Sequence, residues 1–246
     1  MAKKSFAPIN TTIVDDFMAG IDDLRAGLIN LEDPHYDDKA LTIFLLLRFH
    51  ANCSMEFYTN ETMLCELIGI SSRLENKVSV MANILKMEED GLLYISRTTN
   101  NKFFYLMLDY DAFMPEKNFV VIYKEEFEQL VHEKNRDKLI WLLYAIKRFQ
   151  HRNTAISFPS METLLNISHI SKPTVCKCLQ QLEPLFNIYR ARINFYDGTY
   201  KDVNYYKSLS EESGISADTV AAIVKKHYSN VQSITTRKED DNGKTI

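Results

Sequence analysis

The sequence predicts a mainly helical protein of the α+β class with small β-hairpins, in which one succession of helices and strands occurs twice. Apolar residues recur at helical spacing over most of the chain, and two pairs of strand-like runs each flank a polar turn. Short motifs of the first half return about 100 residues later. Together these patterns indicate two domains in tandem, each ending in a hairpin.

Two helical patterns open the chain. Residues 11–30 place apolar side chains on one stripe and acidic ones mostly off it, which is typical of an amphipathic helix, and Thr11 or Thr12 is expected to cap it. Residues 39–50 form a strongly apolar helix. The stripe of the first helix needs a partner, and its own domain is preferred over a second subunit.

Two more helices complete the first half. Thr59 or Asn60 is expected to cap a helix that ends at Gly69. The run Ser72-Arg73-Leu74-Glu75 fits a capping box and predicts the start of the next helix. The buried face of that helix is expected to hold Val78, Met81, Ala82 and Leu85. Strands are then expected over residues 92–96 and 103–108.

The second half repeats this order after a polar boundary over residues 111–118. Asp197-Gly198 is a strong hairpin-turn signal between two alternating runs. The expected elements are a strand over 119–123, helices over 124–133, 137–151 and 161–166, a helix capped by Ser171, and strands over 188–195 and 199–206.

Direct matches link the two halves. Glu61-Thr62-Met63-Leu64 lines up with Glu162-Thr163-Leu164-Leu165 at an offset of 101 residues, and Ile70-Ser71 lines up with Ile170-Ser171 at an offset of 100. Loop insertions produce such small differences in offset. We interpret the halves as two copies of one architecture, in preference to a chance likeness between helical segments.

Charge is distributed unevenly along the chain. The net charge is −4, but residues 134–207 contain 12 basic and 5 acidic residues, a net of +7. The remainder contains 17 basic and 28 acidic residues, a net of −11. Phosphate affinity depends on where positive charge lies, so the total does not exclude a nucleic-acid partner. Basic residues on solvated helix faces would give the same asymmetry.

Several functional classes have no support in the sequence. The longest apolar run, residues 40–47, is far shorter than the ~20 residues of a membrane helix. No phosphate-binding glycine loop, nucleophile elbow or metal-binding histidine spacing occurs, and Cys176 and Cys178 point to different sides of a helix. We expect a soluble, cytoplasmic protein with reduced thiols that is not an enzyme and needs no metal or cofactor.

One segment carries a more specific resemblance. The run from Ile170 to Glu183 has an Ile-Ser cap, two polar residues, Thr174-Val175, polar positions, a leucine and a closing Leu182-Glu183. This pattern resembles the recognition helix of bacterial winged-helix proteins. It departs from them at the turn, where Ile167-Ser168-His169 has no glycine. The resemblance implies a winged helix-turn-helix fold, in tandem here, that binds double-stranded DNA.

A recognition helix that buries Val175, Leu179 and Leu182 leaves a polar face outward. Lys and Gln can hydrogen-bond to base edges in the major groove, and Thr can contact a thymine methyl group or a phosphate. The candidate DNA-binding residues of this helix are Lys172, Thr174, Lys177, Gln180 and Gln181. The wing adds Arg190, Arg192 and Lys201, the long basic helix adds Arg148 and Arg152, and the first copy adds Arg73 and Lys77 beside Asn76 and Asn83. The first copy is poorer in charge, so the second is expected to be the main DNA reader.

The sequence divides into five expected parts: an acidic N-terminal arm (1–34), a first winged-helix domain (35–114), a second (118–207), a C-terminal helical pair (208–236) and a disordered tail (237–246). The helical pair also resembles a helix-turn-helix, although a structural pair that closes a domain or a dimer explains it equally well. We expect a homodimer formed through the N-terminal half.

The layout is similar to that of replication initiators from plasmids or phages of Gram-positive bacteria. This resemblance implies sequence-specific DNA binding in replication control. A transcriptional regulator with the same fold is a close alternative. A winged-helix interaction or assembly factor, as in partition or primosome-loading complexes, is a third alternative and ranks below both. The replication or transcription machinery is a further candidate partner.

Overall fold

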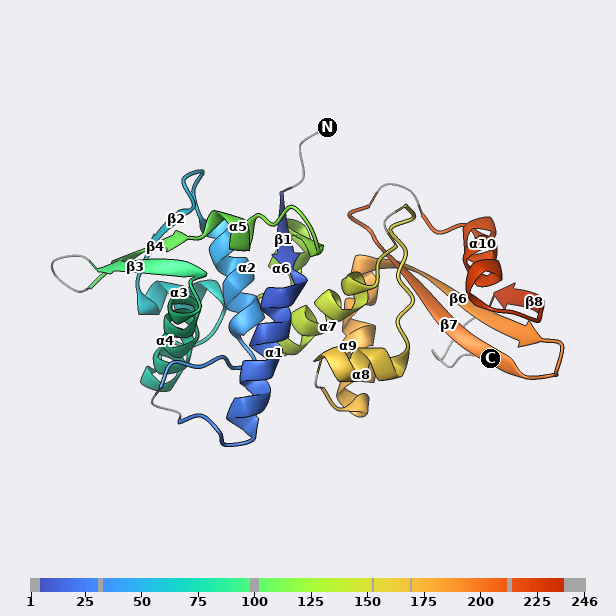
Figure 1. Ribbon diagram of the computed structural model, residues 1–246, viewed down its shortest axis with the longest axis horizontal. Helices are drawn as coiled ribbons and strands as arrows, with labels where there is room; N and C mark the ends of the chain where they lie inside the picture. Colours follow the sequence, from blue (N-terminus) through green and yellow to red (C-terminus); the bar gives the residue numbers. More distant parts are fainter. Residues whose placement is uncertain are drawn as a thin grey trace. The chain divides into compact units, whose positions relative to one another are not determined.

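The computed structural model describes residues 5–30, 33–97, 102–151, 153–168, 170–211 and 214–236. It belongs to the α+β class, with helices and small antiparallel sheets. The chain divides into two compact units, residues 1–144 (unit 1) and residues 145–246 (unit 2), and each is described by itself (Figure 1). No helix among these described residues is both long and apolar enough to cross a membrane.

Unit 1 surrounds the apolar helix α2 (Ala40–His50) with the remaining elements. Leu41 to Leu47 are all buried, so α2 is covered on every side. The elements before it are β1 (Phe6–Asn10) and α1 (Thr11–Arg25). Those after it are β2 (Glu56–Thr59), α3 (Glu61–Leu67), α4 (Leu74–Glu89), β3 (Leu93–Arg97), β4 (Phe104–Leu108), α5 (Tyr110–Phe113), β5 (Phe119–Tyr123), α6 (Lys124–Leu130) and α7 (Arg136–Arg148), within which the unit boundary falls.

Unit 2 is built on a long hairpin. Its strands β6 (Phe186–Phe195) and β7 (Tyr200–Ser208) are joined by the predicted turn at Asp197-Gly198. The hairpin is preceded by α8 (Met161–Ser168), α9 (Lys172–Leu182) and a short 3₁₀ turn, η1 (Glu183–Leu185). It is followed by α10 (Ala217–His227) and β8 (Val231–Thr236), which joins the sheet at the free edge of β6.

The order and pairing of elements recur along the chain. The first succession is α2, β2, α3, α4, β3 and β4, with the antiparallel sheet order β2-β4-β3. The second is α7, an extended residue at Ser157, α8, α9, β6 and β7, and Ser157 pairs with Tyr206 of β7. In both, the segment before the helix pair joins the second strand of the hairpin.

The N-terminal segment is an integral part of unit 1. Ile13, Phe17 and Ile21 of α1 are buried, so the amphipathic stripe packs within its own unit, as expected. The helix starts differently from the prediction. Asn10 caps it by accepting a hydrogen bond from the backbone N–H of Thr12, so neither Thr11 nor Thr12 is the cap.

The unit boundary differs from the expected one at residues 111–118. β5 pairs with β1 in an antiparallel ladder in which Ile9 lies opposite Val120. This pairing joins β5, which follows the expected boundary, to the N-terminal strand β1. Residues 119–144 therefore belong to unit 1. In the C-terminal region, residues 209–211 form a turn, where the first helix of the expected pair was predicted to begin. The second helix of that pair corresponds to α10.

The start and the buried face of α4 also differ from the prediction. The predicted capping box at Ser72 is wrong, because α4 begins at Leu74 and its N-cap residue is Arg73. Arg73 makes no side-chain capping hydrogen bond. Val78, expected in the core, is 53% exposed. Asn83, expected outside, is fully buried because its side-chain amide donates hydrogen bonds to Asp37 and to the Ser79 carbonyl oxygen. The buried residues of α4 are Val80, Ala82, Asn83, Ile84 and Met87.

Asp37 is the centre of this buried polar network. Its carboxylate accepts hydrogen bonds from the Lys39 ammonium at 2.9 Å, from the Ser79 hydroxyl and from Asn83. Burial by itself would raise the pKa of Asp37, but the Lys39 charge and these hydrogen bonds outweigh burial and lower the pKa. The network fixes the loop before α2 to α4.

The lowered pKa predicts how stability depends on pH. In the unfolded chain Asp37 has its ordinary pKa of about 3.9, so its charged form stabilises the fold above that pH, and this contribution disappears as the pH falls through the folded-state value. Asp37→Asn should lower the free energy of unfolding at pH 7 by ~1–3 kcal/mol and reduce its decline below about pH 4. Urea unfolding over a pH series tests this, with the exposed Asp23→Asn as the control. Parallel stability curves for wild type and Asp37→Asn would contradict it.

Candidate nucleic-acid interface

Helix α9 is anchored by a short apolar stripe. Ser171 has an extended backbone conformation, and Pro173 lies in the first turn, where its missing N–H is tolerated. Val175, Cys178 and Leu182 are buried. Leu179, which was predicted to be buried, is only half-buried, and Cys178 takes its place in the centre of the stripe. Ser171 is the N-cap residue by position, but its hydroxyl is bonded to that of Thr174 at 2.9 Å.

The opposite face of α9 is open. Lys172, Lys177, Gln180 and Gln181 are exposed, and Thr174 is half-buried. Among the residues that the structure describes, neither lysine forms an ion pair with a carboxylate. The exposed side therefore offers two cations and two amides on one helix surface.

One face of the hairpin is linked to the end of α9 through the short turn η1. Phe186 and Tyr206 pack edge to face at the base of the hairpin, on the side where Arg190 forms an ion pair with Glu183 at 2.7 Å, just after α9. Strand alternation places Arg192 on the same face. The same face also carries the polar side chains of Asn194, Tyr200, Asp202 and Asn204.

The two wing arginines are compensated by acidic partners. Asp202 lies directly opposite Arg192 and accepts two hydrogen bonds from its guanidinium, at 2.9 and 3.0 Å. The same guanidinium lies 4.2 Å from the centre of the Tyr200 ring. The hydrogen bond to Asp202 raises the pKa of Arg192. The hairpin face is thus polar and ordered, but it adds little net charge.

The structure does not bring every expected residue to this surface. Lys201 lies opposite Ile193, and its ammonium is 5.1 Å from the centre of the Tyr228 ring, so it belongs to the other face of the hairpin. Arg148 is half-buried in the last turn of α7. Arg152 lies outside the described residues. Arg73 and Lys77 belong to α4 in unit 1.

The sequence contained a signal that would have found Asp202. Residues at equal distance from the loop face each other in a two-stranded hairpin, and the expected strand ends at Phe195 and Thr199 leave a loop of three residues, 196–198. Counting outward from that three-residue loop places Arg192 opposite Asp202 and Lys201 opposite Ile193, as observed. The register alone therefore assigns the two basic side chains, Arg192 and Lys201, to opposite faces of the hairpin.

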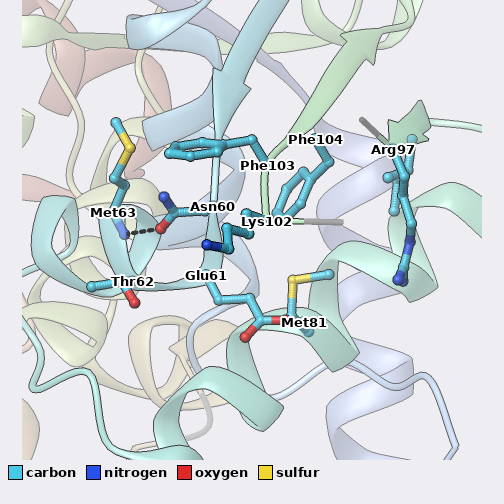
Figure 2. A pocket seen from close by; sticks show the side chains of 10 residues that line it. Asn60, Glu61, Thr62, Met63, Met81, Arg97, Lys102, Phe103 and Phe104 are labelled. Atoms are coloured by element: carbon cyan, nitrogen blue, oxygen red, sulfur yellow. Dashed lines mark hydrogen bonds between the residues drawn. The ribbon is translucent and has the colours of Figure 1, made fainter. Parts of the chain in front are cut away.

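The corresponding surface of unit 1 has a different character. Leu74 and Val78 are exposed on the outer face of α4, where α9 carries lysines. A hollow of about 430 Å³ lies between the start of α3, α4 and the β3–β4 hairpin. Figure 2 shows the methionine side chains of Met63 and Met81 in it, with Phe103 above. Glu61 lines the hollow together with Arg97 and Lys102, so its charges are mixed.

Net charge separates the units in the same sense. Unit 1 contains 15 basic and 23 acidic residues, a net of −8, and unit 2 contains 14 basic and 10 acidic residues, a net of +4. Within the described ranges, His, Cys, Asp and Glu side chains do not gather in groups of three or more that could hold a metal ion. The arrangement is suited to binding an anionic polymer on unit 2.

Comparison with known protein families and with curated proteins finds no match to this chain.

Thiol reactivity reports the rotation of α9. Cys176 is exposed, Cys178 is buried, and in unit 1 Cys53 is exposed while Cys65 is buried with a pKa raised by burial. Because the thiolate is the reactive form, N-ethylmaleimide should label Cys53 and Cys176 in the native protein and spare the other two cysteines. Peptide mass spectrometry measures this, and the denatured protein should label at all four. Equal labelling of Cys178 and Cys176 would mean that α9 is rotated.

Proposed function

We propose that this chain is a double-stranded-DNA-binding protein with two winged helix-turn-helix domains, and that α9 of unit 2 enters the major groove. The observation that carries the proposal is the open face of α9, with Lys172, Lys177, Gln180 and Gln181 opposite an anchored apolar stripe. The proposed role is binding without catalysis.

The recurrent topology supports the winged-helix assignment. In both successions a helix pair is followed by a hairpin whose second strand pairs with the segment before the pair. In winged helix-turn-helix domains the second helix of the pair is the recognition helix. That position is taken by α9 in the second succession and by α4 in the first. The lysines of α9 and the apolar side chains of α4 favour α9 as the reader.

The chemistry of the surface suggests how binding is divided. A B-DNA major groove is ~12 Å wide and admits a helix, where Lys and Gln can donate to guanine and adenine edges. Arg190 and Arg192 are held by Glu183 and Asp202, so they suit contacts with sugars and phosphates at fixed positions. The positive charge of unit 2 supplies attraction that does not depend on sequence.

The biological setting that we propose is replication control on a plasmid or phage, on the strength of the layout resemblance. Sequencing the DNA fragments that the purified protein selects tests this setting. Repeated sites beside an origin agree with an initiator, whereas sites in the protein's own promoter alone would indicate a transcriptional regulator. A homodimer through the N-terminal half stays a prediction, which sedimentation equilibrium can check.

Lys177→Ala should weaken binding to a selected site and relax its sequence preference. A lysine that contacts a base edge contributes ~1–3 kcal/mol of discrimination, or about 5- to 150-fold in affinity. Fluorescence anisotropy titrations on matched and mismatched sites measure this. Lys77→Ala on α4 is the matched control and should leave affinity within a factor of about two. Equal effects of the two variants would remove α9 as the reader, and no binding even at low salt would end the proposal.

Asp202→Asn should strengthen DNA binding. The substitution removes a negative charge from the hairpin face and leaves Arg192 uncompensated, so one more phosphate can be neutralised. The slope of log affinity against log salt should steepen by about 0.9. Titrations between low and moderate salt measure the slope, and Arg192→Ala should weaken binding less than Lys177→Ala. An unchanged slope in Asp202→Asn would show that this face lies away from the DNA.

A further inference from the structure

The three-stranded sheet of unit 1 exposes an aromatic face. Tyr58 of β2, Tyr94 of β3, and Tyr105 and Met107 of β4 are 45%, 57%, 44% and 39% exposed, respectively. Their neighbours along the strands, such as Leu106, point to the opposite side and are buried, because successive strand residues alternate between faces. Large apolar side chains therefore occupy the side of the sheet that faces away from α3 and α4 (Figure 1).

These side chains form one continuous surface. Tyr58 lies opposite Tyr105 in the β2–β4 ladder, with ring centres 4.6 Å apart, and Tyr94 lies opposite Met107 in the β3–β4 ladder. Phe103, which also lines the hollow beside α3, stacks on Tyr58 with ring centres 5.1 Å apart, so it borders this surface at the start of β4. Contiguous apolar surface of this kind marks interaction sites in soluble proteins, whereas singly scattered apolar residues do not.

Unit 2 shows how an equivalent face is covered. The side of the β6–β7 hairpin that points away from α9 carries Ala191, Ile193, Val203 and Tyr205. Helix α10 packs on it through Val220 and Val224, which are one helical turn apart and fully buried (Figure 1). The second copy of the architecture thus uses an amphipathic helix as the cover of this sheet face.

In unit 1 the segment after the β3–β4 hairpin does not cover the outer face of the sheet. Helix α5 follows β4 immediately, and its Phe113 is buried against Phe44 of α2, with stacked rings 4.1 Å apart. The chain therefore returns to the core side of the sheet. The exposed fractions of Tyr94 and Met107 show that no described residue fills the position that α10 takes in unit 2.

Charge at this face identifies the kind of occupant. Glu56 lies on the face opposite Met107, and Asp109 and Asp111 follow at the end of β4. The basic residues of the hairpin that the structure describes, Arg97 and Lys102, line the hollow between the hairpin, α3 and α4 (Figure 2). An acidic edge opposes both a nucleic acid and a second, equally acidic copy of this face, and it attracts a basic partner.

We propose that the face formed by Tyr58, Tyr94, Tyr105 and Met107 binds an amphipathic helix of a partner protein. The partner helix carries aliphatic residues at i and i+4, as α10 does, and Lys or Arg along its flanks. The aliphatic stripe packs on the tyrosine rings, and the basic flanks meet Glu56, Asp109 and Asp111. The site lies in unit 1 and does not depend on DNA binding by α9.

The test uses the full-length protein and three probes. The first is a fluorescent helical peptide of about four turns, composed of Leu, Ala and Lys with leucines at i, i+4 spacing. The second is the same peptide with Glu in place of every Lys, and the third is oligothymidine. The Lys peptide should bind saturably at one site. Tyr94→Ser/Met107→Ser should weaken that binding at least about tenfold, because it removes exposed side chains and not core ones. Leu28→Ser, another exposed apolar position of unit 1, is the matched control.

Each outcome decides the proposal. Binding of the Lys peptide alone, lost in Tyr94→Ser/Met107→Ser and kept in Leu28→Ser, supports it. Equal binding of the Glu peptide, binding unaffected by the double variant, or no binding at all overturns it. Oligothymidine binding that the double variant abolishes would instead identify a nucleic-acid platform, and a dimer that the double variant dissociates would identify self-association. DNA affinity of the double variant should equal that of the wild type, which separates this result from a failure of the α9 proposal.

Discussion

What α9 presents to a partner depends on three anchoring side chains. Val175, Cys178 and Leu182 are buried on one side of the helix, and their burial fixes its rotation about its own axis. A helix that rotated by one residue position would bring Lys172 or Lys177 toward the core, where an unpaired ammonium is strongly disfavoured. The polar surface is therefore a consequence of core packing, and the lysines need no partners of their own to be held outward.

Strand alternation has the same controlling effect on the hairpins. In β6 and β7 it assigns Arg192 and Asp202 to the side of α9, and Ile193 and Val203 to the side that α10 covers. In β3 and β4 it sends Leu93 and Leu106 into the core and leaves Tyr94 and Tyr105 outside. A shift by one residue would exchange these faces completely, so the turn that sets the register also determines which residues are available for recognition.

The sequence predicted what depends on local signals. Gly69 ends α3 with a positive φ, and Asp197-Gly198 forms the hairpin turn, since both depend on a few adjacent residues. Of the candidate site, the exposure of Lys177 and Gln180 followed from helical periodicity. Long-range effects were missed. Asn83 is polar and buried because Asp37, far away in sequence, satisfies its amide, and β5 finds its partner in β1. Neither contact has a local signature.

The two units therefore differ most in what the shared topology leaves exposed. In unit 2 a helix covers the outer sheet face, and α9 exposes cations within a unit of net charge +4. In unit 1, whose net charge is −8, the outer sheet face is open and α4 exposes Leu74 and Val78. Negative charge weakens any competition by unit 1 for phosphate, while exposed apolar surface gains free energy from burial against another protein. The two units share a succession of elements but differ in net charge and in the apolar side chains that they expose, so the features that favour a phosphate-bearing partner lie in unit 2 and those that favour a protein partner lie in unit 1.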